Sequence, residues 1–220
     1  MHRLQKHIFH KLITNSQLRY SQLKPAEVEG NLFMYHLRQL TKEGLVEKTD
    51  DGLYELTPEG KVRADQFSLQ LFKPRLQPRI VTLIVCQNEE GQWLMFRRRR
   101  QPLYGQVGFP YGKLHIGESV KEAAERELKE KTGLSVALTH RGDGYISICE
   151  EGEPVSQILF HLFYGQSPSG KLKARVKAGE SFWADIADIK DDKLIVSVPD
   201  LIYLLAQNPS QRFFAELNYA

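Results

Sequence analysis

The feature that most constrains this chain is residues 112–134, which combine the composition of a helix with carboxylates on the face that such a helix buries. Helix formers run from about residue 118 to residue 132, and Gly133 supplies the end. At about 100° per residue, four small or apolar side chains share one face: Val120, Ala123, Ala124 and Leu128. Glu127 and Lys131 lie inside the same stripe, and Glu130 lies at its edge. Because a buried carboxylate is costly by itself, this face must contact a metal ion, a charged partner or water.

The spacing in this stretch resembles the signature of the Nudix hydrolase superfamily, and residues 112–134 are called the box below. The signature is a glycine, five residues, a glutamate, seven residues, and then Arg-Glu-apolar-x-Glu-Glu-x-Gly-apolar. The matching residues are Gly112, Glu118, Arg126, Glu127, Leu128, Glu130, Gly133 and Leu134. Lys131 stands where the second glutamate of the pair is expected. An ordinary amphipathic helix would explain the helical face but not the two glycines and the arginine together, so we favour the resemblance.

The resemblance, which covers roughly residues 76–207, implies an α/β/α sandwich around a mixed sheet whose box binds Mg²⁺ against a diphosphate. It implies Glu127 and Glu130 as metal ligands or base, with Gly112 and Glu180 as further candidates for the metal site. Arg126 belongs to the catalytic group, where we expect it to brace the loop by pairing with a carboxylate. Four residues are candidates for ligand binding: Arg97 for phosphate, Phe109 for a base, Gly112 and Lys131.

Lys131 leaves two functions open. An ammonium group cannot be a ligand of Mg²⁺, although Glu127 four residues before it is well placed for a helical ion pair. The lysine therefore favours a domain that binds a nucleotide diphosphate, such as ADP-ribose, without cleaving it. The alternative is a working Mg²⁺-dependent pyrophosphohydrolase that cleaves a nucleoside diphosphate linked to another group.

Hydrophobic patterns around the box fit this fold. Residues 79–87 predict a strand buried on both faces, and further strands are predicted at 92–96, 145–148 and 158–164. We expect residues 182–184 to form the last strand and residues 199–207 a closing helix.

The first 65 residues predict a different domain. Helices are expected at 2–15, near 21–23 and at 31–43, followed by a hairpin of residues 45–48 and 54–56. This order is that of a winged helix-turn-helix, and residues 35–60 resemble regulators of the ArsR and MarR-like group. The whole chain is therefore expected to be α+β, with a winged helix-turn-helix joined to the sandwich.

The third helix is the predicted recognition helix. We expect Leu32, Phe33, Leu37 and Leu40 to face inward and Met34 to face outward with the candidate DNA contacts. Those contacts are Asn31, Tyr35, Arg38 and Lys42. Residues 1–65 carry ten lysines and arginines against nine acidic residues, a weak charge for a DNA-binding domain. Dimerisation or protein contact is therefore the alternative role.

Length and composition set the remaining expectations. With 220 residues and 41% hydrophobic content, two domains fit, at 1–65 and 79–220, joined by a linker at 66–78 with two prolines in residues 73–78. The longest apolar run is about six residues, too short for a membrane span. Cys86 and Cys149 have no metal-ligand spacing, so we expect reduced thiols and a cytoplasmic protein. The winged helix-turn-helix predicts, separately, a homodimer that binds duplex DNA.

Overall fold

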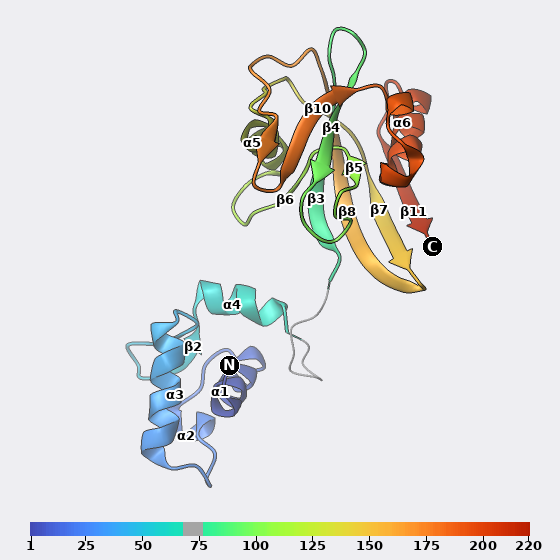
Figure 1. The fold of residues 1–220 in the computed structure, drawn as a ribbon. Coiled ribbons are helices and arrows are strands. Elements are labelled where there is room, and N and C mark those ends of the chain that lie inside the picture. The colour runs from blue at the N-terminus through green and yellow to red at the C-terminus, as the bar shows by residue number, and fades with distance from the viewer. Residues whose placement is uncertain (68–76) are drawn as a thin grey trace. The chain divides into compact units, whose positions relative to one another are not determined.

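The computed structural model describes residues 1–67 and 77–220 and divides the chain into two compact units, Met1–Gln77 and Pro78–Ala220 (Figure 1). Each unit is described here by itself. The division falls inside the predicted linker, and most of its proline-containing part, residues 73–78, lies outside the described residues. Within the described ranges, no helix has the length and apolar character that crossing a bilayer requires.

The N-terminal unit consists of helices around a two-stranded antiparallel sheet. Its elements are α1 (Arg3–Ile13), α2 (Tyr20–Leu23), α3 (Gly30–Lys42), β1 (Val46–Lys48), β2 (Tyr54–Leu56) and α4 (Pro58–Asp65). Gly44 follows α3 with φ of 70°, a conformation that glycine adopts without strain. Helix α4 was not predicted from the sequence, although Thr57 caps it by accepting from the Gly60 amide and Pro58 occupies its first turn.

The buried face of α3 differs from the predicted one by one position. Phe33, Leu37 and Leu40 are buried as predicted, but the fourth buried residue is His36 and not Leu32, which is 48% exposed. Spacings of three and four residues place His36 on the stripe with Phe33 and Leu40, and its ring stacks on that of His2 at 4.0 Å. Met34, expected to face outward, is half-buried against the same core.

The C-terminal unit is a mixed sheet with a helix on each face (Figure 1). The strand order is β11-β7-β8-β3-β4-β10-β9, with β5 paired to β4 and β6 paired to β3. The strands are β3 (Arg79–Gln87), β4 (Trp93–Arg98), β5 (Val107–Gly108), β6 (Tyr111–Lys113), β7 (Thr139–Glu150), β8 (Glu153–Gln166), β9 (Arg175–Val176), β10 (Gly179–Ala184) and β11 (Phe213–Tyr219). The helices are α5 (Val120–Thr132) and α6 (Val198–Gln207), with two short 3₁₀ turns at Ile186–Asp188 and Asp191–Lys193. This arrangement confirms the predicted mixed-sheet sandwich.

The end of the chain corrects the predicted order of elements. Residues 182–184 are not the last strand and α6 does not close the fold, because β11 follows and pairs in parallel with β7. Along β11 the more buried residues alternate with exposed ones, and this period of two was a usable signal for a strand.

Strand β3 is the centre of the unit, and it is buried on both faces as predicted. On one face Ile84 and Cys86 pack against Ala124 and Leu128 of α5. The opposite face belongs to the core cluster that includes α6. Burial raises the pKa of the Cys86 thiol to about 12, so the thiol is protonated and unreactive at neutral pH. Packing against one face of β3 fixes α5 relative to the strands that carry the rest of the site.

Candidate functional site

Helix α5 holds the acidic side chains of the box in a defined register. Ser119 and Glu122 cap its first turn reciprocally, with the Ser119 amide donating to Glu122 Oε2 at 2.7 Å. Gly133, with φ of 75°, ends the helix. Ala123, Ala124 and Leu128 are buried as predicted, whereas Val120 on the same face is half-buried. The helix therefore presents its remaining inward positions, 127 and 131, to strand β6.

Gly112 makes room for Glu127. A Cβ atom built on Gly112 would lie 1.8 Å from Glu127 Cγ, a distance at which the side chain could not remain in place. Strand β6 holds Gly112 opposite Thr82 of β3, so the backbone cannot easily move away. The glycine allows a carboxylate that is only 8% exposed to lie directly against the backbone.

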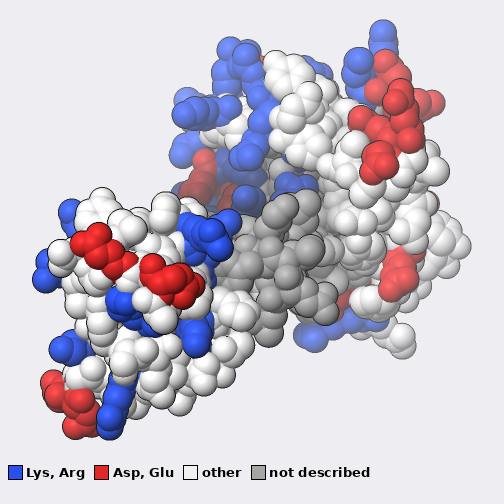
Figure 2. All heavy atoms as spheres, turned by 90° about the horizontal axis from the view of Figure 1, so that it is seen from below, with Lys and Arg blue, Asp and Glu red and all other residues white. Residues whose placement is uncertain are grey.

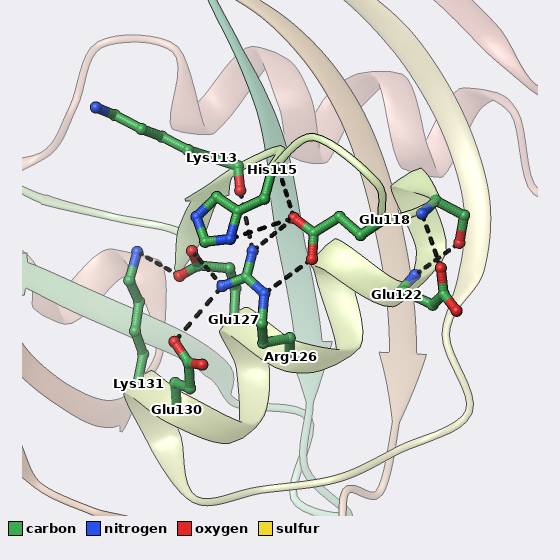
Figure 3. Close-up of polar contacts among 9 residues, drawn as sticks. Lys113, His115, Glu118, Glu122, Arg126, Glu127, Glu130 and Lys131 are labelled. Atoms are coloured by element: carbon green, nitrogen blue, oxygen red, sulfur yellow. Dashed lines mark hydrogen bonds and ion pairs between the residues drawn. The ribbon is translucent and has the colours of Figure 1, made fainter. Parts of the chain in front are cut away.

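Arg126 connects the loop to the helix, as expected from the sequence (Figure 3). Its guanidinium makes two hydrogen bonds to the Glu118 carboxylate, at 2.8 and 2.9 Å, and one to the Lys113 carbonyl at 3.1 Å. It also donates to Glu127 Oε1 at 3.0 Å. The two hydrogen bonds from Arg126, with one from the His115 amide, hold the pKa of Glu118 at about 2, well below its usual range. Arg126 thus connects the loop residues Lys113 and Glu118 to Glu127 on the helix.

Lys131 occupies the space beside the other oxygen of Glu127. Its Nζ lies 3.2 Å from Glu127 Oε2 and donates a hydrogen bond to the Tyr111 carbonyl. The ammonium also lies 4.5 Å from the centroid of the Tyr111 ring. The ion pair predicted from the spacing of four residues is therefore present, and each oxygen of the buried carboxylate faces a cation.

These residues form one wall of a cavity of about 210 Å³, called the box cavity. It is lined by Arg79, Phe96, Arg98, Arg100, Tyr111, Gly112, Lys113, His115, Glu127, Lys131 and Ala178. Of these described lining residues, five are lysine or arginine and Glu127 alone is acidic. The pKa of Tyr111 is lowered, because the positive charges of Arg98 and Lys131 outweigh the opposite effect of burial. The cavity is therefore suited to an anion.

Arg98, which was not singled out from the sequence, reaches the cavity from strand β4 in place of Arg97. Strand β4 sends Phe96 and Arg98 to one side, whereas Arg97 points to the other and is 52% exposed. Arg98 is 5% exposed and donates through Nε to the Pro102 carbonyl at 2.9 Å, while its Nη2 has no partner among the described residues. The alternation of strand residues could have identified it. A buried donor without a partner favours a ligand that accepts from it.

The structure does not bring Arg97 or Glu180 to this cavity. Glu180 lies opposite Arg97 in the β4–β10 pairing and its carboxylate faces three arginines, with Arg175 Nη2 at 2.6 Å. The Arg175 hydrogen bond, with Arg99 and Arg97 nearby, lowers the pKa of Glu180. These contacts occupy the acid that the sequence suggested as an extra metal ligand.

Phe109 lies in an adjoining cavity of different character. This space of about 50 Å³ is lined mainly by apolar side chains and shares Arg79, Arg98 and Tyr111 with the box cavity. Phe109 is 5% exposed and packs edge-on against Trp93. The shared arginines therefore stand between a cationic space and an apolar one.

The groups that surround Glu127 do not form a coordination site for a Mg²⁺ ion. Magnesium requires oxygen ligands at about 2.0–2.1 Å in near-octahedral geometry. Both Glu127 oxygens and the Tyr111 carbonyl instead accept from cationic groups. The Glu130 side chain is 62% exposed, and among the described residues its carboxylate pairs with Arg126, at 3.5 Å. The lysine ammonium supplies positive charge at this place without offering a coordination site.

The predicted DNA contacts form a row along α3, called the α3 face. Asn31, Tyr35, Arg38 and Lys42 are all exposed, Tyr35 by 57%. Their spacing of three and four residues places them on one side of the helix, opposite the buried stripe. On the face of this unit seen in Figure 2, basic and acidic side chains are interspersed. The α3 face is thus accessible and carries two basic side chains, although residues 1–65 as a whole are nearly neutral.

Comparisons with known proteins bear on the C-terminal unit. The sequence profile of the NUDIX domain matches residues 77–205, more than half of the chain. The ADP-ribose pyrophosphatase of Methanocaldococcus jannaschii is 29% identical over 101 residues, which cover 46% of this chain and 59% of that protein. The RNA pyrophosphohydrolase of Caulobacter vibrioides is 38% identical over 80 residues, which cover 36% and 45%. The chain thus spans about half the length of curated relatives it matches.

Solved structures show the same fold. The NUDIX domain of Shewanella oneidensis NrtR, crystallised with ADP ribose, superposes with a TM-score of 0.53 at 15% identity, covering 70% of this chain and all of that chain. A NUDIX hydrolase from Nitrosomonas europaea gives a TM-score of 0.52 at 20% identity, covering 62% and 94%.

Proposed function

The chain belongs to the NUDIX domain family, and on that premise we propose that it is a DNA-binding transcriptional regulator whose degenerate Nudix domain senses a nucleotide diphosphate. The observation that carries this proposal is the position of Lys131. Its ammonium pairs with Glu127 and the Tyr111 carbonyl where the resemblance places a metal ligand. A cation fixed in the protein attracts phosphate permanently but cannot generate a metal-bound hydroxide. Binding is retained and cleavage is lost.

The ligand class follows from the two adjoining cavities. A diphosphate matches the box cavity, where Arg79, Arg98 and Lys131 line the wall with a single carboxylate and the free Arg98 Nη2 can donate. An apolar or aromatic group attached to it would enter the space beside Phe109. ADP-ribose, the ligand of the NrtR NUDIX domain in the Shewanella oneidensis structure, combines these features and is the first ligand to test.

The DNA-binding half of the proposal rests on the N-terminal unit. Three helices followed by a hairpin form the order of a winged helix-turn-helix, and the α3 face is exposed in the position of a recognition helix. Two copies in a homodimer would place these helices about one duplex turn apart. The near-neutral charge implies few phosphate contacts, so base contacts from the α3 face would provide most of the specificity.

A Mg²⁺-dependent hydrolase is the second candidate. The curated relatives carry pyrophosphatase and pyrophosphohydrolase names, and the chain retains Glu127, Glu130 and Arg126 of the box. In that case the N-terminal unit would serve dimerisation or targeting.

Calorimetry with ADP-ribose separates the two candidates. We expect wild type to bind ADP-ribose equally well in EDTA and in Mg²⁺, and to hydrolyse it very slowly in either. Lys131→Met should weaken binding by about tenfold, the value of one charge-assisted contact of about 1.5 kcal/mol. Lys129→Met on the exposed side of α5 is the matched control and should bind as wild type does. Rapid Mg²⁺-dependent turnover that Glu127→Gln abolishes would establish the hydrolase instead.

A further inference from the structure

A second group of ligating side chains lies on strands β7 and β8, away from the residues that line the box cavity. His140, Asp143 and His161, called the histidine cluster, offer one ligand atom each, and these atoms lie within 4.8 Å of one another. In the described part of the chain, no other set of three or more His, Cys, Asp or Glu residues meets this condition. We propose that the histidine cluster binds a divalent transition metal ion of the zinc class.

A break in the register of β7 brings the cluster together. In a regular strand, residues three apart point to opposite faces, so His140 and Asp143 would be separated. The pairing with β8 shifts between His140 and Gly142, which inserts one extra residue and returns Asp143 to the side of His140. Asp143 then lies directly opposite His161 of β8. The bulge thus converts three separate residues into a convergent group.

Within the cluster, one nitrogen of each imidazole faces the same Asp143 oxygen, so a metal ion could take the place of the hydrogen atoms between them. His140 Nε2 lies 2.8 Å from Asp143 Oδ1, and His161 Nδ1 lies 2.6 Å from the same oxygen. In a tetrahedral zinc site with bonds of about 2.0–2.1 Å, ligand atoms are about 3.3 Å apart, so modest side-chain rotations would suffice. A neutral imidazole moves its proton to the other ring nitrogen when the first binds a metal. No fixed cation has to leave, in contrast to the position beside Glu127.

The surroundings leave the metal one open side. The three side chains are between 22% and 37% exposed and line a hollow together with Val120, Lys121 and Arg212. Three protein ligands with an accessible fourth position are the arrangement that exchanges water or a small ligand. Lys121 and Arg212 would stabilise an anion in that position. Two imidazoles and one carboxylate suit zinc or cobalt better than magnesium or calcium.

Cobalt titration of the full-length chain, stripped of metal with EDTA, tests the proposal. We expect wild type to bind one Co²⁺ with the intense visible absorption of a tetrahedral site, and Zn²⁺ to displace it. His140→Gln and His161→Gln should each weaken Co²⁺ binding at least about a hundredfold, because even partners of metal ligands contribute 10–100-fold. Asp143→Asn, which keeps hydrogen-bond acceptance but not charge, should weaken it as well.

Two controls keep the outcome decisive. His7→Gln alters a half-buried histidine of the N-terminal unit and should leave the Co²⁺ spectrum unchanged. Zn²⁺ should raise the melting temperature of wild type and His7→Gln but not of His140→Gln, whose circular dichroism verifies its fold. The proposal is overturned if wild type develops no Co²⁺ band, if His140→Gln binds as wild type does, or if Glu127→Gln and not the histidine variants removes the metal.

Discussion

Helices α3 and α5 are both thirteen residues long, yet they differ in whether their polar side chains have partners within the protein. On α5, Arg126 contacts three carboxylates and Lys131 pairs with one of them, Glu127 (Figure 3). Lys131 also donates to the Tyr111 carbonyl. On α3, the side chains of Asn31, Arg38 and Lys42 make no hydrogen bond or ion pair with other described residues. One helix carries a fixed charge network, and the other carries a free row of polar groups.

The difference teaches what each helix can recognise. Groups that are already held in place bind a small anion without further loss of side-chain freedom, so α5 suits a compact ligand. Groups that are free must be ordered by their partner, which requires many contacts at once and a large surface such as duplex DNA. Substitutions that change one helix or its support at a time therefore test this difference.

The largest effect should come from Lys131→Glu. This change removes the cation beside Glu127 and supplies the carboxylate that the Nudix signature expects, so Mg²⁺ can bind. A metal contributes several kcal/mol to stabilisation of the transition state, and each 1.36 kcal/mol is tenfold in rate. We therefore expect the rate of ADP-ribose hydrolysis in Mg²⁺ to rise by about a hundredfold, measured by phosphate release after a coupled phosphatase.

Lys129→Glu is the control for that gain, because Lys129 lies on the exposed side of the same helix. It should leave the rate at the wild-type level. An equal rate for wild type and Lys131→Glu would mean that this lysine does not block metal chemistry, and the contrast between a fixed and a free helix would lose its functional meaning.

Gly112→Ala should displace Glu127 from its ion pairs with Arg126 and Lys131. The new methyl group would overlap Glu127 Cγ, and overpacking of this kind costs about 1–3 kcal/mol in the free energy of unfolding. ADP-ribose binding should be lost at the same time, because Glu127 must leave its place between Arg126 and Lys131. Urea denaturation and calorimetry measure the two effects.

Gly91→Ala separates stability from binding. Gly91 has φ of 83° and open space around it, so alanine there costs about 1–2 kcal/mol of backbone strain without touching the cavity. It should bind ADP-ribose normally. Normal binding by Gly112→Ala would show that Glu127 need not occupy its observed position.

The same contrast explains what the sequence could predict. Along α5 the helical period and the spacing of four residues were sufficient to predict the Glu127–Lys131 pair, because both partners lie on one helix. Arg98 and the partners of Glu180 depend on which side of β4 and β10 each residue faces, and that depends on strand pairing between distant segments. The histidine cluster requires a bulge and a particular pairing of β7 with β8, and neither can be predicted from the sequence of one strand alone. Leu32 was misassigned because His36 is polar, although its ring stacks on His2.

The α3 face should show a smaller, sequence-dependent effect. Arg38→Ala should remove a base contact worth about 1–3 kcal/mol and relax sequence preference, whereas Lys42→Ala should weaken all sequences alike. Selection of binding sites from random duplexes, followed by anisotropy titrations at several salt concentrations, measures both. Lys61→Ala on α4 is an exposed control. If wild type enriches no sequence at low salt, the N-terminal unit is a dimerisation module and the free row has another partner.

The smallest effect concerns the protonation of Glu118, which Arg126 binds. Arg126 holds the pKa of Glu118 at about 2, so the carboxylate stays ionised and bonded well below its ordinary pKa near 4.5. Because the folded-state pKa is lowered, the stabilisation is complete above pH 4.5 and is lost as the pH falls toward 2. In Arg126→Gln the pKa of Glu118 should return toward 4.5, measured by carbon-13 NMR titration of side-chain carboxyls. Glu122 provides the internal control, since its lowered pKa comes mainly from Ser119 and should not move. A wild-type Glu118 that titrates near 4.5 would mean that Arg126 does not hold the loop in solution, and α5 would then be as free as α3.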